Sequence, residues 1–253
     1  MKQPDHVRHN RSFWDADSDA YQTAHGDALR RAPMAWGAYR VDENELQVLG
    51  NVGDRDVLEL GCGAAQWSIA LGTRGARAVG LDVSRVQLSH ARDASPRAPL
   101  VLASGEQLPL RAKAFDIVFC DHGAISFCDP DVIVPEVARI LRPGGLLAFC
   151  ATHPLLYLTW DPDTENQTRK LHLDYRELGR RALPEGTIDW ALPPSAWIRV
   201  LTRNGFEVLD CIELVAAADA DTTYDDYAPP KWARRWPAEW IWKARRIGSA
   251  EFP

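Results

Sequence analysis

Short apolar runs alternate with longer amphipathic segments along most of the chain. The run VLEL, which begins at Val57, is followed by a glycine turn and then directly by residues that can begin a helix. Similar runs of strand length recur downstream, and segments of helix length separate most of them. The predicted strands are residues 56–61, 76–82, 99–103, 115–120, 145–152, 206–213 and 240–245. The predicted helices are residues 64–72, 84–94, 131–141 and 195–204.

Strands that are separated by helices predict an α/β fold with a doubly wound, mostly parallel sheet and helices on both faces. Ser84 and Ser195 suit N-cap positions, and Pro143-Gly144-Gly145 is expected to end a helix and lead into a strand. Two stretches do not fit the alternation, residues 153–194 and 214–239. Connections of this length in a compact domain are usually functional.

Composition narrows the class of protein. With 253 residues, of which 46% are hydrophobic and 25% charged, the chain fits one large domain or two small ones. Its five cysteines are odd in number and form no C-x-x-C pair, so we expect reduced, buried thiols and a cytoplasmic location. A net charge of −6 with scattered basic residues argues against a nucleic-acid partner. No apolar stretch has the length of a signal peptide core or a membrane span, so no membrane partner is expected.

The glycine turn after the first predicted strand is the strongest candidate for a ligand site. In open parallel sheets, ligands bind beyond the carboxyl ends of the strands. The pair Gly61 and Gly63 fits a plain tight turn or a close approach of backbone to ligand. Asp82 favours the ligand, because it ends the next predicted strand 21 residues after Gly61, where an acid can accept both hydroxyls of a ribose. The sequence therefore predicts a nucleoside, but no third glycine completes a dinucleotide fingerprint.

At this turn the sequence resembles the class I S-adenosylmethionine-dependent methyltransferases, in particular bacterial members that act on small molecules. Their first motif, E/D-x-G-x-G-x-G, reads here as Glu59-Leu60-Gly61-Cys62-Gly63-Ala64-Ala65, with Ala65 in place of the third glycine. Further motifs follow in order: SGEQLPL at 104–110, FDIVFCDHGAISF at 115–127 and ILRPGGLLAF at 140–149. The resemblance covers about residues 56–152. It implies a Rossmann-like sheet of seven strands with the last strand antiparallel, and S-adenosyl-L-methionine as cofactor.

The resemblance also implies how the chain is organised. We expect residues 1–253 to form a single methyltransferase domain. Residues 1–50 would form an N-terminal helical cap, 51–152 the cofactor-binding core, 153–194 and 214–239 two insertions on the substrate side, and 248–253 a tail.

Cofactor contacts are carried over by position from the family pattern. Gly61 and Gly63 fall beside the methionine and adenosine parts, and Asp82 beside the ribose hydroxyls. Glu59 either faces the amino group of the cofactor or only anchors the glycine loop. The stretch NRSFWDADSDAYQTAHG resembles an opening helix whose aromatic and histidine side chains close over the cofactor, although the same spacing fits an amphipathic cap. The predicted cofactor-binding residues are Glu59, Gly61, Cys62, Gly63, Asp82, Val83, Ser104, Gly105, Glu106, Cys120, Trp14, Tyr21 and His25.

Methyl transfer from a sulfonium is an in-line displacement, which needs a base only if the nucleophile arrives protonated. His122 and Asp121 follow the fourth strand beside the methyl donor, and we predict both as catalytic, although a hydrogen-bonded structural histidine is the other interpretation. No cluster supplies the octahedral oxygen set of Mg²⁺, so we predict no metal. Aromatic side chains in the two long insertions either line a small-molecule pocket or pack as a flap on the chain itself or on a second subunit. The predicted substrate-binding residues are His153, Tyr157, Trp190, Tyr224 and Tyr227.

Three functions remain in competition. The first is methyl transfer to an oxygen, nitrogen or carbon atom of a small molecule by a monomer or homodimer. The second is an NAD(P)-dependent oxidoreductase, which the missing third glycine and the segment Arg142-Pro143-Gly144-Gly145 disfavour. The third is a non-catalytic interaction module, which the intact Gly61, Gly63 and Asp82 disfavour. The sequence does not name the acceptor or the atom that is methylated.

Overall fold

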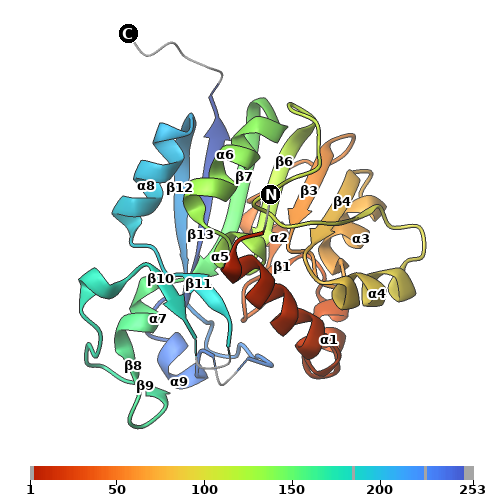
Figure 1. Cartoon of the computed structure of the whole chain (residues 1–253). Helices are drawn as coiled ribbons and strands as arrows, with labels where there is room; N and C mark the ends of the chain where they lie inside the picture. Colours follow the sequence, from red (N-terminus) through yellow and green to blue (C-terminus); the bar gives the residue numbers. More distant parts are fainter. Residues whose placement is uncertain (1–2, 184–185, 225–226, 248–253) are drawn as a thin grey trace.

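A seven-stranded sheet forms the centre of the computed structural model, which describes residues 3–183, 186–224 and 227–247 (Figure 1). The strand order is β12-β13-β7-β6-β3-β4-β5. From β7 to β5 all neighbours pair in parallel, whereas β13 pairs antiparallel with both β7 and β12. The predicted mostly parallel sheet with an antiparallel last strand is therefore confirmed. The strands are β3 (Asp56–Leu60), β4 (Arg77–Asp82), β5 (Leu100–Leu102), β6 (Phe115–Asp121), β7 (Leu141–Thr152), β12 (Phe206–Leu214) and β13 (Glu239–Arg246).

The four predicted helices are present as α3 (Gln66–Thr73), α4 (Arg85–Ala94), α6 (Pro130–Ile140) and α8 (Pro194–Arg203). Ser84 caps α4 as predicted, since its hydroxyl accepts a hydrogen bond from the Gln87 amide at 3.1 Å. The N-cap prediction for Ser195 is wrong. Helix α8 begins one residue earlier, at Pro194, because a proline at the first helical position has no amide to satisfy and already holds the helical φ.

Alternating strand residues form the two faces of the sheet. Leu58, Val118 and Phe149 point to the face that α6 and α8 cover. Val57, Ile117 and Phe119 point to the opposite face, where they pack with Trp36 and Trp67. Residues in this odd-numbered register of β3 and β6, including Glu59 and Asp121, therefore lie on the second face.

Most of the remaining elements lie at the carboxyl edge of the parallel strands, drawn at the bottom of Figure 1, whereas the segment around Leu46 and Val48 packs on the second face of the sheet. None of the helices in the described part of the chain combines the length and apolar character needed to cross a membrane. The N-terminal region contains α1 (Asp5–Arg31), β1 (Ala35–Trp36), β2 (Val41–Asp42) and α2 (Glu43–Leu46), and α5 (Ala124–Phe127) follows β6. The long insertions contain α7 (Pro154–Thr159), β8 (Trp160–Asp161), β9 (Asn166–Gln167), the 3₁₀ turn η1 (Tyr175–Glu177), β10 (Arg180–Ala182), β11 (Ile188–Trp190) and α9 (Pro230–Ala233). The tail expected at 248–253 lies outside the described residues.

Candidate active site

A cavity of about 940 Å³ opens at this edge of the sheet. Its walls come from the turn after β3, the ends of β4 and β6, helix α1 and both long insertions. The cavity wall includes both predicted catalytic residues and most of the predicted binding residues. Those on the cofactor side are Trp14, Tyr21, His25, Glu59, Gly61, Cys62, Gly63, Asp82, Val83, Ser104 and Gly105; those on the substrate side are Tyr157, Tyr224 and Tyr227.

The glycine turn is shaped by a close approach of two backbone segments. Gly61 has φ +72°, and a Cβ atom there would lie 2.3 Å from the backbone nitrogen of Ala124. The turn therefore passes so close to the segment after β6 that a side chain does not fit. Ala65, at the position of the third family glycine, also has a left-handed conformation with φ 57°. Ala65 therefore keeps the left-handed backbone that a glycine adopts freely, at a strain of about 1–2 kcal/mol.

Asp82 is held against the glycine turn by two backbone amides. Its Oδ2 accepts from Gly63 N at 2.9 Å, and its Oδ1 accepts from Ser84 N at 2.7 Å. Burial raises the pKa of Asp82 to about 6, while the backbone hydrogen bonds act in the opposite direction. Each carboxylate oxygen keeps a further lone pair, and the residue lines the cavity. This arrangement fits an acceptor for two neighbouring hydroxyl groups, as in a ribose.

Glu59 connects β3 to α3 and also lines the cavity. Its Oε2 accepts from the Ser68 amide at 2.9 Å and from the Ser68 hydroxyl at 2.6 Å. Burial raises the pKa of Glu59 to about 8, and the two bonds from Ser68 lower it in part. Its Oε1 has no hydrogen-bond partner among the residues that the structure describes. Anchoring of the loop therefore uses one oxygen, and the other oxygen fits a donor such as an ammonium group of a ligand.

Helix α1 and the insertion at 214–239 meet over the cavity. The hydroxyl oxygens of Tyr21 and Tyr224 are 2.7 Å apart. The ring of His25 stacks on Tyr224, with centroids 4.0 Å apart and planes inclined by 8°, and its Nδ1 lies 2.8 Å from the hydroxyl of Thr223. Trp14 packs edge-on against Tyr21. Tyr21 and His25, which were predicted to cover the cofactor, therefore contact Tyr224, which was predicted to bind substrate.

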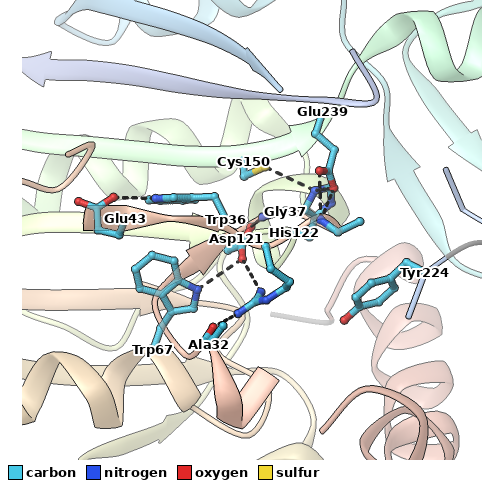
Figure 2. Close-up of polar contacts among 12 residues, drawn as sticks. Ala32, Trp36, Gly37, Glu43, Trp67, Asp121, His122, Cys150, Tyr224 and Glu239 are labelled. Atoms are coloured by element: carbon cyan, nitrogen blue, oxygen red, sulfur yellow. Dashed lines mark hydrogen bonds and ion pairs between the residues drawn. The ribbon is translucent and has the colours of Figure 1, made fainter. Parts of the chain in front are cut away.

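His122 and Asp121 lie at the end of β6 and have different partners (Figure 2). His122 has φ 50°, and its Nε2 is 2.7 Å from Oε1 of Glu239. Burial lowers the pKa of His122, but the charge and hydrogen bond of Glu239, with the charge of Asp121, raise it above its ordinary value. Asp121 accepts from Gly37 N at 3.0 Å and lies 3.8 Å from Nη1 of Arg40. Burial raises the pKa of Asp121, against the lowering effect of the nearby cations.

Asp121, His122 and Cys150 bring three potential metal-ligating atoms within 4.8 Å of one another. Hydrogen bonds and an ion pair already engage these side chains: Asp121 accepts from Gly37 N, His122 Nε2 contacts Glu239, and Cys150 Sγ lies 3.5 Å from the same Nε2.

Two predicted cofactor residues lie away from the cavity wall. Cys120 is fully buried on the α6 side of the sheet, where its sulfur accepts from the Ile125 amide at 3.5 Å. Glu106 accepts from the Asp129 amide at 2.7 Å and lies 2.5 Å from Nε2 of His6. Its carboxylate thus connects α1 to the start of α6.

Two predicted substrate residues also lie outside the cavity wall. His153 is the N-cap of α7, where its Nδ1 accepts from the Leu155 amide at 3.1 Å and its Nε2 is 3.3 Å from Glu213. Trp190 packs edge-on against the ring of His6, with centroids 4.9 Å apart. His153 thus contacts the start of α7, and Trp190 contacts helix α1.

Sequence reasoning missed several polar residues of the cavity wall, namely Arg40, Gln87, Arg181, Asp189 and Glu239. Glu239 had a usable signal: it is a single acid at the start of the apolar run EWIW, where a solvated side chain is not expected. Arg181 lies opposite Asp189 in the β10–β11 hairpin, inside a segment without a clear hydrophobic period. No sequence pattern marks these two residues as neighbours.

The fold and the site together define a class of protein. A Rossmann-like sheet with an antiparallel last strand, a glycine turn after β3 and an acid at the end of β4 is the architecture that the sequence motifs implied.

Comparisons with known proteins agree with this class. Residues 58–149 match the family model described as a methyltransferase domain. An uncharacterized methyltransferase from Synechocystis is 33% identical over 129 residues, which cover 50% of this chain and 61% of the relative. A malonyl-acyl carrier protein O-methyltransferase from Salmonella typhimurium is 32% identical over 141 residues, 54% of this chain and 52% of the relative. The crystal structure of a putative S-adenosylmethionine-dependent methyltransferase from Listeria monocytogenes matches with a TM-score of 0.67 at 22% identity, and covers 81% of this chain and 98% of that one.

Residues 58–149 therefore carry a methyltransferase domain, and the chain shares its fold with S-adenosylmethionine-dependent methyltransferases of known structure. The chain spans about half the length of the curated relatives that it matches.

Proposed function

We propose that this protein transfers a methyl group from S-adenosyl-L-methionine to an oxygen, nitrogen or carbon atom of a small molecule. The observation that carries this proposal is a single cavity that contains the glycine turn, Asp82, His122 and the tyrosines of both insertions. Asp82 would also fit the ribose of a dinucleotide, but the missing third glycine disfavours an oxidoreductase, and the intact Gly61, Gly63 and Asp82 disfavour a non-catalytic module.

The cofactor side of the cavity fits S-adenosylmethionine, which when bound supplies an electrophilic methyl group on its sulfonium. Asp82 would accept hydrogen bonds from the ribose hydroxyls, and the free Oε1 of Glu59 would accept one from the amino group. The backbone turn at Gly61 and Gly63 leaves room for the cofactor to lie against it. Tyr21 and His25 would limit the access of water from the α1 side.

The acceptor side would be formed by the long insertions. Tyr157, Tyr224 and Tyr227 contribute aromatic surface to the same cavity, which suits a small, largely apolar acceptor. His122 would take up the proton of the acceptor. Asp121 would hold the 37–40 turn through the amide of Gly37 and add negative charge beside the imidazole. His153 and Trp190 would support the acceptor side without direct contact.

We further propose a cytoplasmic monomer or homodimer whose partner is a small-molecule substrate, with neither nucleic acid nor membrane as a partner. The net charge of −6 supports the absence of a nucleic-acid surface, and five free cysteines, four of them buried, support a reducing compartment. The name of the Salmonella relative indicates a carrier-bound acceptor for that protein. A carrier-bound acid is therefore one probe that an acceptor screen should contain.

Calorimetry with S-adenosylhomocysteine, NAD and NADP tests the cofactor. We expect binding of S-adenosylhomocysteine at micromolar concentrations and no binding of either nicotinamide cofactor. Incubation with S-adenosylmethionine and a panel of phenols, amines, carboxylic acids and malonyl-acyl carrier protein, followed by detection of S-adenosylhomocysteine, tests the transfer. Binding of NAD in place of S-adenosylhomocysteine would contradict the proposal.

A further inference from the structure

Glu239 is a buried carboxylate whose contacts converge on one imidazole. It is the first residue of β13, lies opposite Thr152 at the end of β7, and is 1% exposed. Its two oxygens accept from the amide of Ala38 at 2.8 and 3.0 Å, and its Oε1 lies 2.7 Å from Nε2 of His122 (Figure 2). Burial of a carboxylate costs free energy unless hydrogen-bond donors replace the lost water, and the Ala38 amide and the His122 ring are such donors.

The turn before Ala38 is built around this carboxylate. Gly37 has φ +69°, and a Cβ atom there would lie 2.2 Å from Oε2 of Glu239. Any side chain at Gly37 would occupy the place of the carboxylate. The Gly37 amide donates to Asp121, the neighbour of His122, so the same turn fixes both acids next to the imidazole.

The contact with Glu239 decides which nitrogen of His122 carries a hydrogen when the ring is neutral. A carboxylate can only accept, so Nε2 must be the protonated nitrogen and Nδ1 must keep its lone pair. Cys150 Sγ is near the same Nε2, at 3.5 Å. Within the ranges that the structure describes, Nδ1 has no hydrogen-bond partner, and the His122 side chain is 29% exposed and lines the cavity.

We propose that Glu239 is a positioning residue that fixes the Nε2–H form of His122, so that Nδ1 accepts a proton from an acceptor whose reacting atom is a hydroxyl oxygen. This inference rests on the methyl transfer proposed above and names its substrate class. The acceptor O–H bond breaks and its proton moves to Nδ1. The oxygen electron pair forms the bond to the methyl carbon, and the electron pair of the broken sulfur–methyl bond stays on sulfur.

A carboxylate acceptor does not need this arrangement. It is already ionised near neutral pH, so a base would have no proton to remove. Beside the imidazole it would meet the negative charges of Glu239 and Asp121, and Arg40, which also lines the cavity, already lies 3.8 Å from Asp121. A hydroxyl group is neutral on arrival and develops negative charge only as its proton reaches the imidazole.

Nitrogen-15 NMR of the histidine rings, in the protein with S-adenosylhomocysteine bound, tests the tautomer directly. We expect a protonated Nε2 and an unprotonated Nδ1 for His122 above its pKa, with the signal assigned from a His122→Asn variant. Glu239→Gln should lower the His122 pKa, because the negative charge is removed, and should weaken the preference for this tautomer, because an amide can either accept from or donate to Nε2. The other groups that face the ring, namely Asp121, Cys150 and Tyr227, are unchanged in this variant.

Glu213→Gln is the matched control. It removes a carboxylate 3.3 Å from another histidine at the same sheet edge, His153, and should leave the tautomer and pKa of His122 as in the wild type. An Nδ1–H tautomer in the wild type, or a tautomer and pKa that do not respond to Glu239→Gln, would overturn the assignment. The wild-type measurement decides the question even if the variant does not fold.

Turnover with 4-methylphenol, which is neutral near pH 7, and with 4-methylbenzoate, which is ionised, tests the acceptor class. We expect the phenol to be methylated and the matched carboxylate not, with a loss of turnover of roughly 10²-fold or more in Glu239→Gln and an unchanged affinity for S-adenosylhomocysteine. Methylation of the carboxylate in preference to the phenol would refute the substrate class. A protein that binds S-adenosylhomocysteine but methylates nothing in the acceptor panel would refute the proposed transfer, while the NMR result still decides the tautomer.

Discussion

Replacement of Glu59 by glutamine should make the cofactor-free protein more stable, and only above mildly acidic pH. Burial raises the pKa of Glu59 from an ordinary value of 4.5 to about 8. Below the ordinary value, the carboxyl group is protonated in both the folded and the unfolded chain. Between the two values the unfolded chain releases the proton and the folded chain keeps it, so the free energy of unfolding falls as pH rises. Above the folded-state pKa the loss is complete.

The size of this loss follows from the shift in pKa. At about 1.4 kcal/mol for each pH unit, the shift corresponds to an upper limit of about 5 kcal/mol. Because Glu59 lines a cavity that water can enter, we expect about 2–4 kcal/mol. Glutamine is always neutral, and its carbonyl oxygen can keep both hydrogen bonds from Ser68. The free energy of unfolding of Glu59→Gln should therefore not fall as the pH rises through this range.

Urea unfolding of wild type and Glu59→Gln across about pH 5 to pH 9 measures the difference. The two proteins should have similar stability near the acid end, and the variant should gain steadily toward the alkaline end. Glu43→Gln is a control, since Glu43 is also buried but accepts from Trp36 Nε1 and from the amides of Val48 and Leu49. Glutamine has one acceptor oxygen for these donors, so this variant should be less stable at every pH. A difference between wild type and Glu59→Gln that does not change with pH would refute the reasoning.

Three further predictions concern the cavity. Asp82→Ala should lower the affinity for S-adenosylhomocysteine about 5- to 150-fold, because the ribose hydroxyls lose their acceptor, and calorimetry with unchanged binding would contradict that role. Gly37→Ala should abolish most turnover but retain binding of S-adenosylhomocysteine, since the new Cβ would displace the Glu239 carboxylate; full activity would show that the carboxylate moves without consequence. Replacing residues 224–236 with a short Gly-Ser linker should keep S-adenosylhomocysteine affinity within a few-fold and remove acceptor turnover. Loss of cofactor binding in a folded protein, or a change from dimer to monomer with full activity, would give the segment a different role.

Much of the central sheet could be predicted because β3, β4, β6 and β7 each carry an apolar run that is buried on one or both faces. Elements with only local pairing were not predictable in the same way. β8 and β9 have two residues each and pair only with one another, so they leave no hydrophobic period. β7 begins at Leu141, ahead of the Pro143-Gly144-Gly145 segment that was expected to precede it, since pairing with β6 starts at Leu141 and resumes at Leu146.

Candidate site residues next to strand ends could be predicted because parallel strands bring their carboxyl ends to one edge. Gly61, Gly63, Asp82 and His122 all line the cavity for this reason. Cys120 does not, because alternate residues of a strand point to opposite faces and this one points into the core beneath α6. The contacts of residues in the insertions depend on hairpins and turns that the sequence alone did not resolve.

Glu239 shows how the topology could extend such predictions. β13 is antiparallel and lies between β7 and β12, so its first residue, and not its last, reaches the edge where the parallel strands end. Glu239 therefore arrives beside Thr152 at the end of β7, one strand away from the end of β6, where His122 follows. An antiparallel last strand was predictable from the family motifs, and the acid at its start was visible in the sequence. In this fold a charged residue at the first position of the antiparallel strand is consequently placed to contact groups at the ends of the parallel strands, although Glu239 lies more than a hundred residues after His122 in the chain.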